Sequence, residues 1–347
     1  MNRLLCASLT AACLLLGSPA QAEVRQDRIE LAEGHPTEYV VVKGDTLWDI
    51  SGRFLKLPWL WPEIWDVNPQ IDNPHLIYPG DVIYLRWVDG QPRLSLQRGG
   101  VKKLSPQARV QPLDQAIPAI PLRDIIGFLT DNVIVDQDYL DGAPYVLAGD
   151  NNRIISGAGD RVYARGEPVG DLSHQGVFRP ARAYNDPVTN ELLGYELYKV
   201  AEGRIMAKDD QTGVLSFDLY ESLEEVRVQD RLVPDSEYRI QSVFYPETGP
   251  ALDNAVILDV LGGVAHIGQY DAVALNVGAR EGVEPGHVLA VYSRGEEVKD
   301  PVNNETVLLP SERAGELMIF KVFDKMSYGL VMRATRAMAV GDELRQP

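Results

Sequence analysis

The chain has 347 residues, which is enough for two or three domains, and it carries a formal net charge of −17 at pH 7. Such a negative charge argues against nucleic acid or an anionic membrane surface as the main partner. We therefore expect an acidic multidomain protein with no nucleic-acid partner.

The N-terminal 22 residues have the features of a secretory signal peptide. An apolar run over 4–16 follows a positively charged start, and Ala20-Gln21-Ala22 is a small-x-small cleavage motif. We expect cleavage after Ala22 and export to the periplasm, with no transmembrane segment in the mature chain. Both cysteines, Cys6 and Cys13, would be removed. The mature protein would then lack disulfides and cysteine nucleophiles.

The stretch 39–85 predicts a very small unit with the order strand, helix, helix, strand. The β-branched run 40–42 favours a strand, and Thr46 is placed to cap a helix that starts at the next residue. A second helix is expected over 62–67, because a proline opens it and Asn68-Pro69 stops it. A returning strand is expected over 82–85.

This stretch resembles a LysM domain, which we place at 36–88. Its hallmarks are Gly44-Asp45-Thr46-Leu47-Trp48, Asn68-Pro69 and Ile77-Tyr78-Pro79-Gly80-Asp81. The resemblance implies binding to the glycan strands of peptidoglycan, in a groove between two walls. The implied glycan-binding residues are Gly44, Asp45, Thr46 and Leu47 on one wall, and Asn73, Ile77, Tyr78 and Pro79 on the other.

All five tryptophans lie in or beside this module. Trp48 and Trp65 fall on helical faces, and a unit this small needs large apolar groups to fold, so we expect both in the core. Trp59 and Trp61 lie in a proline-rich stretch. They fit two roles equally well, stacking on sugars or packing the two helices together.

The composition changes over 89–121, which is rich in proline and glycine and predominantly basic. We interpret this stretch as a solvated linker. The alternative is a basic tether that contacts anionic cell-wall polymers or acidic parts of its own chain. One short helix is expected over 122–131.

The rest of the chain has short alternating runs broken by turn residues, which indicates a mostly β region. Two related β-units are predicted there, one over 122–250 and one over 251–347. Four pairs of short matches support the repeat and occur in the same order. They pair 162–166 with 291–295, 186–191 with 300–305, 198–200 with 320–322, and 228–232 with 340–344.

The stretch 278–287 and the pattern from 315 to 342 resemble the C-terminal domain of the flagellar outer-ring protein FlgT. With the LysM-like module, the whole arrangement resembles the secretin-associated proteins of type IV pili. The expected fold class is thus α+β and multidomain. The resemblance implies a non-enzymatic periplasmic scaffold that binds peptidoglycan and an outer-membrane secretin ring. The alternative scaffold is a flagellar or general envelope assembly factor.

The alternative from another class is a peptidoglycan hydrolase with an unrecognised carboxylate site. The five histidines show no spacing typical of a zinc site, so we expect neither a metal nor another cofactor. The adjacent pairs Glu224-Glu225 and Asp209-Asp210 are the candidate carboxylates. Neighbouring residues on a strand point to opposite faces, which favours solvated side chains over an acid–base pair.

Overall fold

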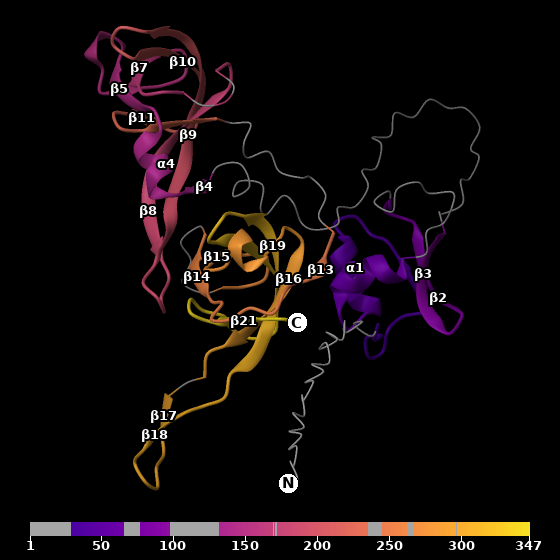
Figure 1. The fold of residues 1–347 in the computed structure, drawn as a ribbon. Coiled ribbons are helices and arrows are strands. Elements are labelled where there is room, and N and C mark those ends of the chain that lie inside the picture. The colour runs from indigo at the N-terminus through magenta and orange to yellow at the C-terminus, as the bar shows by residue number, and fades with distance from the viewer. Residues whose placement is uncertain are drawn as a thin grey trace, which may run out of the picture.

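The computed structural model describes residues 29–65, 77–97, 132–168, 170, 172–234, 245–261, 267–295 and 297–347. These residues form an N-terminal module with two helices, followed by two β-barrels (Figure 1). The predicted fold class, a small βααβ module followed by a mostly β region with two related units, is confirmed. The helix expected over 122–131 lies outside the described residues.

The N-terminal module has the predicted order of elements. They are β1 (Glu38–Val40), α1 (Leu47–Phe54), the 3₁₀ turn η1 (Pro58–Leu60), α2 (Trp61–Ile64) and β2 (Val82–Val88). Thr46 caps α1, because its Oγ1 accepts a hydrogen bond from the Asp49 backbone N–H at 3.1 Å. The helix predicted over 62–67 corresponds to α2, which starts one residue earlier and is followed at Trp65 by extended backbone.

The start of the predicted linker is wrong, because the module contains one more strand. β3 (Gln91–Gln97) pairs antiparallel with β2 along its whole length. Asp89 and Gly90 form the connecting turn with φ of 51° and 76°, the left-handed pair that a two-residue hairpin requires. Leu94 and Leu96 are buried. The strand forms because it covers apolar surface that the strand–helix–helix–strand unit would leave open.

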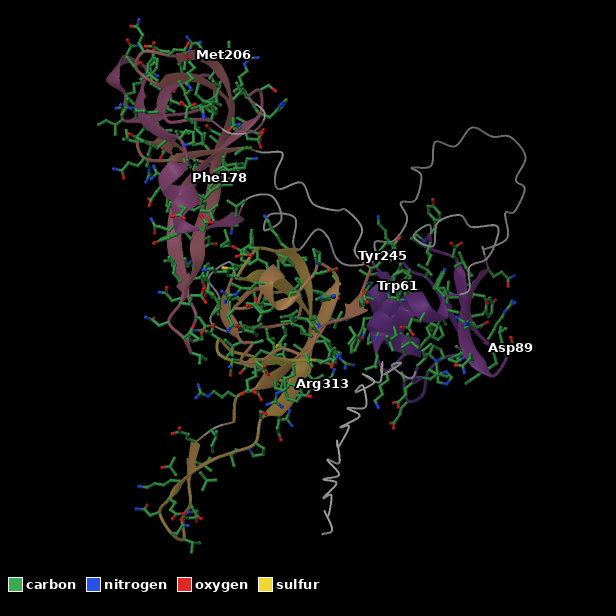
Figure 2. The ribbon with its side chains drawn as sticks, viewed as in Figure 1. Trp61, Asp89, Phe178, Met206, Tyr245 and Arg313 are labelled. Atoms are coloured by element: carbon green, nitrogen blue, oxygen red, sulfur yellow. The ribbon has the colours of Figure 1, made fainter. Side chains whose placement is uncertain are left out.

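The core of the module is built around four tryptophans. Trp59 and Trp61, whose role the sequence left open, are each only 1% exposed, so both pack the helices. The rings of Trp48 and Trp59 lie 6.2 Å apart between centroids, and those of Trp61 and Trp65 lie 6.3 Å apart. Figure 2 shows Trp61 within the helical part of the module. Such large aromatic groups supply the burial that a short chain needs.

Barrel 1 is a closed, six-stranded sheet. Its strands, in order around the barrel, are β5 (Tyr145–Gly149), β7 (Arg161–Arg165), β10 (Val214–Ser222), β9 (Leu192–Asp209), β8 (Gln175–Asn185) and β12 (Arg231–Pro234). Backbone bonds from Val146 N to Asp230 O (2.8 Å) and from Leu232 N to Pro144 O (2.7 Å) close it. Small elements flank it: β4 (Asn132–Val135), α4 (Gln137–Gly142), η2 (Asp150–Asn152), β6 (Ile155–Ser156) and β11 (Val226–Arg227).

Barrel 2 repeats this design. Its strands, in order, are β14 (Ile257–Val260), β15 (Ala272–Leu275), β20 (Ser327–Ala334), β19 (Glu312–Val322), β16 (His287–Ser293) and β21 (Glu343–Arg345). Bonds from Ile257 N to Asp342 O (3.0 Å) and from Leu344 N to Ala255 O (2.8 Å) close it. The remaining elements are β13 (Glu247–Thr248), η4 (Ala279–Glu281), β17 (Glu297–Lys299) and β18 (Thr306–Leu308).

The two barrels agree in strand register as well as in strand order. Val177 pairs with Ala201 in barrel 1, and Val291 pairs with Gly315 in barrel 2; in both, the ladder is interrupted immediately after that pair. The register shift between β5 and β7 recurs at the equivalent pair between β14 and β15. The two shifts between β9 and β10 recur at equivalent pairs between β19 and β20. Register and bulges are specific features of a sheet, so the units are structural repeats.

Two of the four sequence matches identify equivalent residues. The Asp186–Glu191 turn corresponds to Asp300–Glu305: in each, the first Asp N–H bonds the final Glu carbonyl at 2.8 Å. Asp230 and Asp342 also correspond. Each side chain accepts a hydrogen bond from the backbone N–H three residues earlier, at 2.8 and 2.9 Å.

The other two matches are wrong. Tyr163 lies on β7 and Tyr292 on β16, which are not equivalent strands. Lys199 and Lys321 lie on the equivalent strands β9 and β19 but at different positions along them. Lys199 pairs with Phe178, and the equivalent pair in barrel 2 is Arg313 with Tyr292, so Lys199 corresponds to Arg313 and not to Lys321. Short apolar and tyrosine-containing strings suit any strand. Turns that need a capping carboxylate and a positive φ restrict the sequence much more.

Candidate functional site

Two Gly-Asp turns form the frame of the candidate glycan site in the N-terminal module. In the first, the Asp45 carboxylate accepts the Val42 N–H at 2.8 Å; in the second, the Asp81 carboxylate accepts the Tyr78 N–H at 3.0 Å. Gly44 and Gly80 occupy the third position of these turns with φ of 100° and 96°. A side chain at either position would be strained, which explains the glycines.

The backbone of Val41 holds the two turns together. Its carbonyl accepts the Gly80 N–H at 2.8 Å, and its N–H donates to the Asp81 carbonyl at 2.9 Å. Apart from the glycine itself and its two chain neighbours, no heavy atom of the described residues lies within 4 Å of a Cβ built on Gly44 or on Gly80. Both turns therefore present open backbone, and their spacing is fixed before any ligand arrives.

The structure divides the predicted site residues into two groups. Gly44 is exposed, and Asp45, Tyr78 and Pro79 are half-buried on the two turns. The side chains of the remaining described candidates are buried: Thr46, Leu47 and Ile77. Asn73 lies outside the described residues. An approaching sugar would meet the first group directly, while the buried side chains support the turns from beneath.

One neighbour of the site was not anticipated from the sequence. The Tyr39 hydroxyl donates to the Asp45 carboxylate at 3.0 Å, and the Arg53 guanidinium lies 4.6 Å from the centre of the Tyr39 ring. Burial and the bond to Asp45 raise the pKa of Tyr39, so it remains a donor at neutral pH. The twice-occurring pair Gly44-Asp45 and Gly80-Asp81 was the available sequence signal for two facing turns.

The carboxylate pairs considered for hydrolysis have structural partners. Glu224 bonds the Arg179 guanidinium at 2.9 Å, and Asp209 accepts hydrogen bonds from Gln211 and Thr212 within its turn. Asp210 and Glu225 are exposed. Across the described ranges, no group of three His, Cys, Asp or Glu residues is arranged to hold a metal ion. No helix in those ranges is long and apolar enough to span a bilayer.

Comparison with known proteins identifies the module. Residues 39–86 match the family model of the LysM domain. The chain therefore carries a LysM domain, a binding domain whose presence indicates peptidoglycan binding. The chain is also 42% identical over 55 residues to the "Uncharacterized protein YqbP" of Bacillus subtilis (strain 168), which covers 13% of this chain and 25% of that protein. It thus spans about a quarter of the length of this curated relative.

Proposed function

We propose that the protein is a non-enzymatic periplasmic scaffold, exported by a signal peptide cleaved after Ala22. Its LysM domain binds peptidoglycan glycan strands, and its two barrels bind an outer-membrane secretin ring of type IV pili. The observation that carries the proposal is the LysM domain with its two fixed, open turns. Linking a wall-binding site to a protein-binding region raises the effective concentration of one partner at the other.

In the proposed glycan site, the sugar contacts Gly44, Asp45, Tyr78 and Pro79. Backbone groups and the Asp45 carboxylate can bond N-acetyl amides and hydroxyls, while the Tyr78 and Pro79 side chains cover apolar sugar faces. Thr46, Leu47 and Ile77 shape the walls from within the core.

Sedimentation with purified sacculi tests the glycan site. Tyr78→Ala should remove most of the pelleting protein, because it deletes the largest accessible side chain of the second turn. The matched control is Tyr84→Ala, since Tyr84 is half-buried on β2 and lies outside both turns. Equal losses in the two variants would contradict the assignment.

Co-purification from cross-linked envelopes tests the second partner. Deletion of 39–86 should leave the secretin complex intact but free it from sacculi. Deletion of 256–345 should leave the protein on the wall and separate it from the secretin. Recovery of flagellar rings in place of the secretin would favour the other scaffold. Release of soluble muropeptides from sacculi by the purified protein would show that it is a hydrolase.

A further inference from the structure

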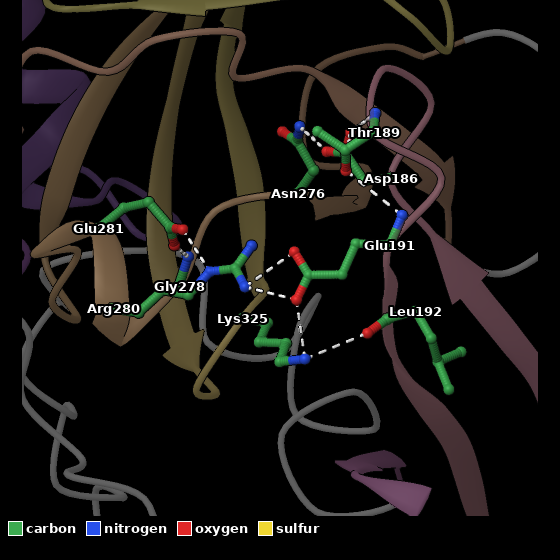
Figure 3. Close-up of polar contacts among 9 residues, drawn as sticks. All are labelled: Asp186, Thr189, Glu191, Leu192, Asn276, Gly278, Arg280, Glu281 and Lys325. Atoms are coloured by element: carbon green, nitrogen blue, oxygen red, sulfur yellow. Dashed lines mark hydrogen bonds and ion pairs between the residues drawn. The ribbon is translucent and has the colours of Figure 1, made fainter.

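The long hairpin of barrel 1 docks on barrel 2 through polar contacts at its tip. We call its outer part, residues 182–196 of β8 and β9, arm 1. The Asn276 side chain donates to the Asp186 carboxylate at 2.7 Å (Figure 3). The Glu191 carboxylate accepts bonds of 2.8 and 3.0 Å from Arg280 and pairs with Lys325 at 2.8 Å. Each acidic group of the turn thus meets a donor on barrel 2.

Apolar side chains lie beneath these polar contacts. Tyr184 and Leu193 of arm 1 are each 5% exposed and belong to one apolar cluster with Phe320 and Tyr328 of barrel 2. The combination of a buried apolar centre and a polar rim is typical of a protein interface. Arm 1 is therefore a docking element rather than a solvated hairpin.

Barrel 2 carries a second arm with the same turn. We call residues 297–309, which contain β17 and β18, arm 2. Asp300 and Glu305 stand at the positions of Asp186 and Glu191, and Asn304 has a φ of 65°, as Asn190 has 58°.

Arm 2 also keeps the apolar pair. Counting from the shared turn, Val298 takes the position of Tyr184 and Val307 that of Leu193. The two valines face each other across the strands and are 37% and 44% exposed.

Arm 2 is open to solvent where arm 1 is covered. Residues 297–299 and 301–309 are all exposed, and Figure 1 shows β17 and β18 extending away from their barrel. A two-stranded ribbon by itself is marginally stable in water. An arm with a formed turn and an open apolar pair thus has the features of a docking element without its acceptor.

We infer that arm 2 of one copy docks on barrel 1 of a second copy, as arm 1 docks on barrel 2 within the chain. The acceptor face of barrel 2 is already covered by arm 1. In barrel 1, Arg165 stands at the position of Asn276, and Met206, which is 49% exposed, stands at that of the buried Phe320. In the second copy, Arg165 would face the Asp300 carboxylate.

The geometry requires two chains. Arm 2 extends away from barrel 1 of its own chain, and Met206 lies at the end of barrel 1 remote from barrel 2 (Figures 1 and 2). An arm-to-barrel contact between copies joins two different surfaces. Such a head-to-tail contact generates a ring if the rotation closes and a filament if it does not.

Disulfide trapping tests the contact in the full chain, with Cys6 and Cys13 replaced by serine. A protein with Asp300→Cys is mixed with one carrying a single acceptor cysteine under mild oxidation. Arg165→Cys should give a cross-linked dimer that exceeds the background of each protein alone. The control is Val340→Cys, an exposed position outside the proposed acceptor face.

Three results would overturn the inference. The first is a dimer no stronger with Arg165→Cys than with Val340→Cys. The second is preferential linkage to Asn276→Cys, which would mean that arm 2 displaces arm 1.

The third comes from sedimentation of the untagged protein over a concentration series. The wild type should associate and Val298→Asp should stay monomeric, whereas Val340→Asp should behave as wild type. Equal masses for all three proteins would contradict the contact.

Discussion

Glu191 of barrel 1 accepts two hydrogen bonds from the Arg280 guanidinium of barrel 2, at 2.8 and 3.0 Å. Together with Lys325, this contact lowers the pKa of Glu191 to about 2. The contact therefore connects two barrels that are structural repeats of one another. It also makes the docking of arm 1 dependent on pH.

The first prediction concerns that dependence. Docking lowers the pKa of the Glu191 carboxyl, so the ionised carboxylate stabilises the docked state. This stabilisation is fully present above the ordinary pKa of about 4.3 and disappears as the pH falls through about 2. Energy transfer between dyes on Met206→Cys and Val340→Cys, with Cys6 and Cys13 replaced by serine, should report separation of the barrels in this window. Because Glu191 is accessible to solvent, the effect should be modest. In Glu191→Gln this pH-dependent change in energy transfer should be absent. A pH profile identical to that of the wild type would contradict the assignment of the change to Glu191.

The second prediction compares the equivalent aspartates Asp230 and Asp342. Asp230 accepts two bonds of 3.0 Å from the Arg179 guanidinium, whereas Asp342 accepts bonds from the backbone N–H groups of Arg294 and Ala339. Removing one partner of a buried ion pair costs about 3–5 kcal/mol. Leaving neutral donors unsatisfied costs about 1–3 kcal/mol.

Denaturant unfolding should therefore show a larger loss for Asp230→Ala than for Asp342→Ala. The double variant Asp230→Ala/Arg179→Met should recover part of the first loss, because it removes a guanidinium that Asp230→Ala leaves with only the exposed Glu224 as its charged partner. A larger loss at Asp342, or no recovery, would show that the turn geometry matters more than the ion pair.

Much of the fold follows from local sequence signals. The cap at Thr46 and the turns at Gly44 and Gly80 restrict the backbone so narrowly that the LysM order could be predicted. The repeat was recognisable at Asp186 and Asp300 for the same reason, since a carboxylate that caps a turn has few substitutes.

Long-range packing could not be predicted in the same way. Arg165 and Asn276 occupy equivalent barrel positions with no shared chemistry, because arm 1 covers only the second. The burial of Trp59 and Trp61 likewise depends on how the helices meet. The pairing of β3 with β2 could have been predicted from Asp89-Gly90, because this dipeptide is a strong hairpin signal. The basic composition of the following stretch led to the prediction of a linker instead.

The third prediction concerns this added strand. Leu94 on β3 is fully buried, so Leu94→Ala should lower the free energy of unfolding of the module by about 2–5 kcal/mol. Hydrogen exchange in the full chain can follow the module separately, through the amides of α1. The control is Arg93→Ala, whose side chain bonds the Glu63 carbonyl at the module surface. If the α1 amides of Leu94→Ala are protected as well as those of Arg93→Ala and of the wild type, β3 contributes little to the core.

The last prediction separates folding from glycan binding at Thr46. This side chain is buried and accepts the Asp49 N–H, while its hydroxyl donates to the Asp49 carboxylate at 2.7 Å. Loss of an N-cap costs about 1 kcal/mol, so Thr46→Ala should weaken protection of the α1 amides by roughly fivefold, whereas Thr46→Ser should preserve it. Both variants should still pellet with sacculi at temperatures where the module is folded, because the hydroxyl faces the helix. A Thr46→Ala protein that keeps its exchange protection but no longer pellets would instead make this hydroxyl a direct sugar contact.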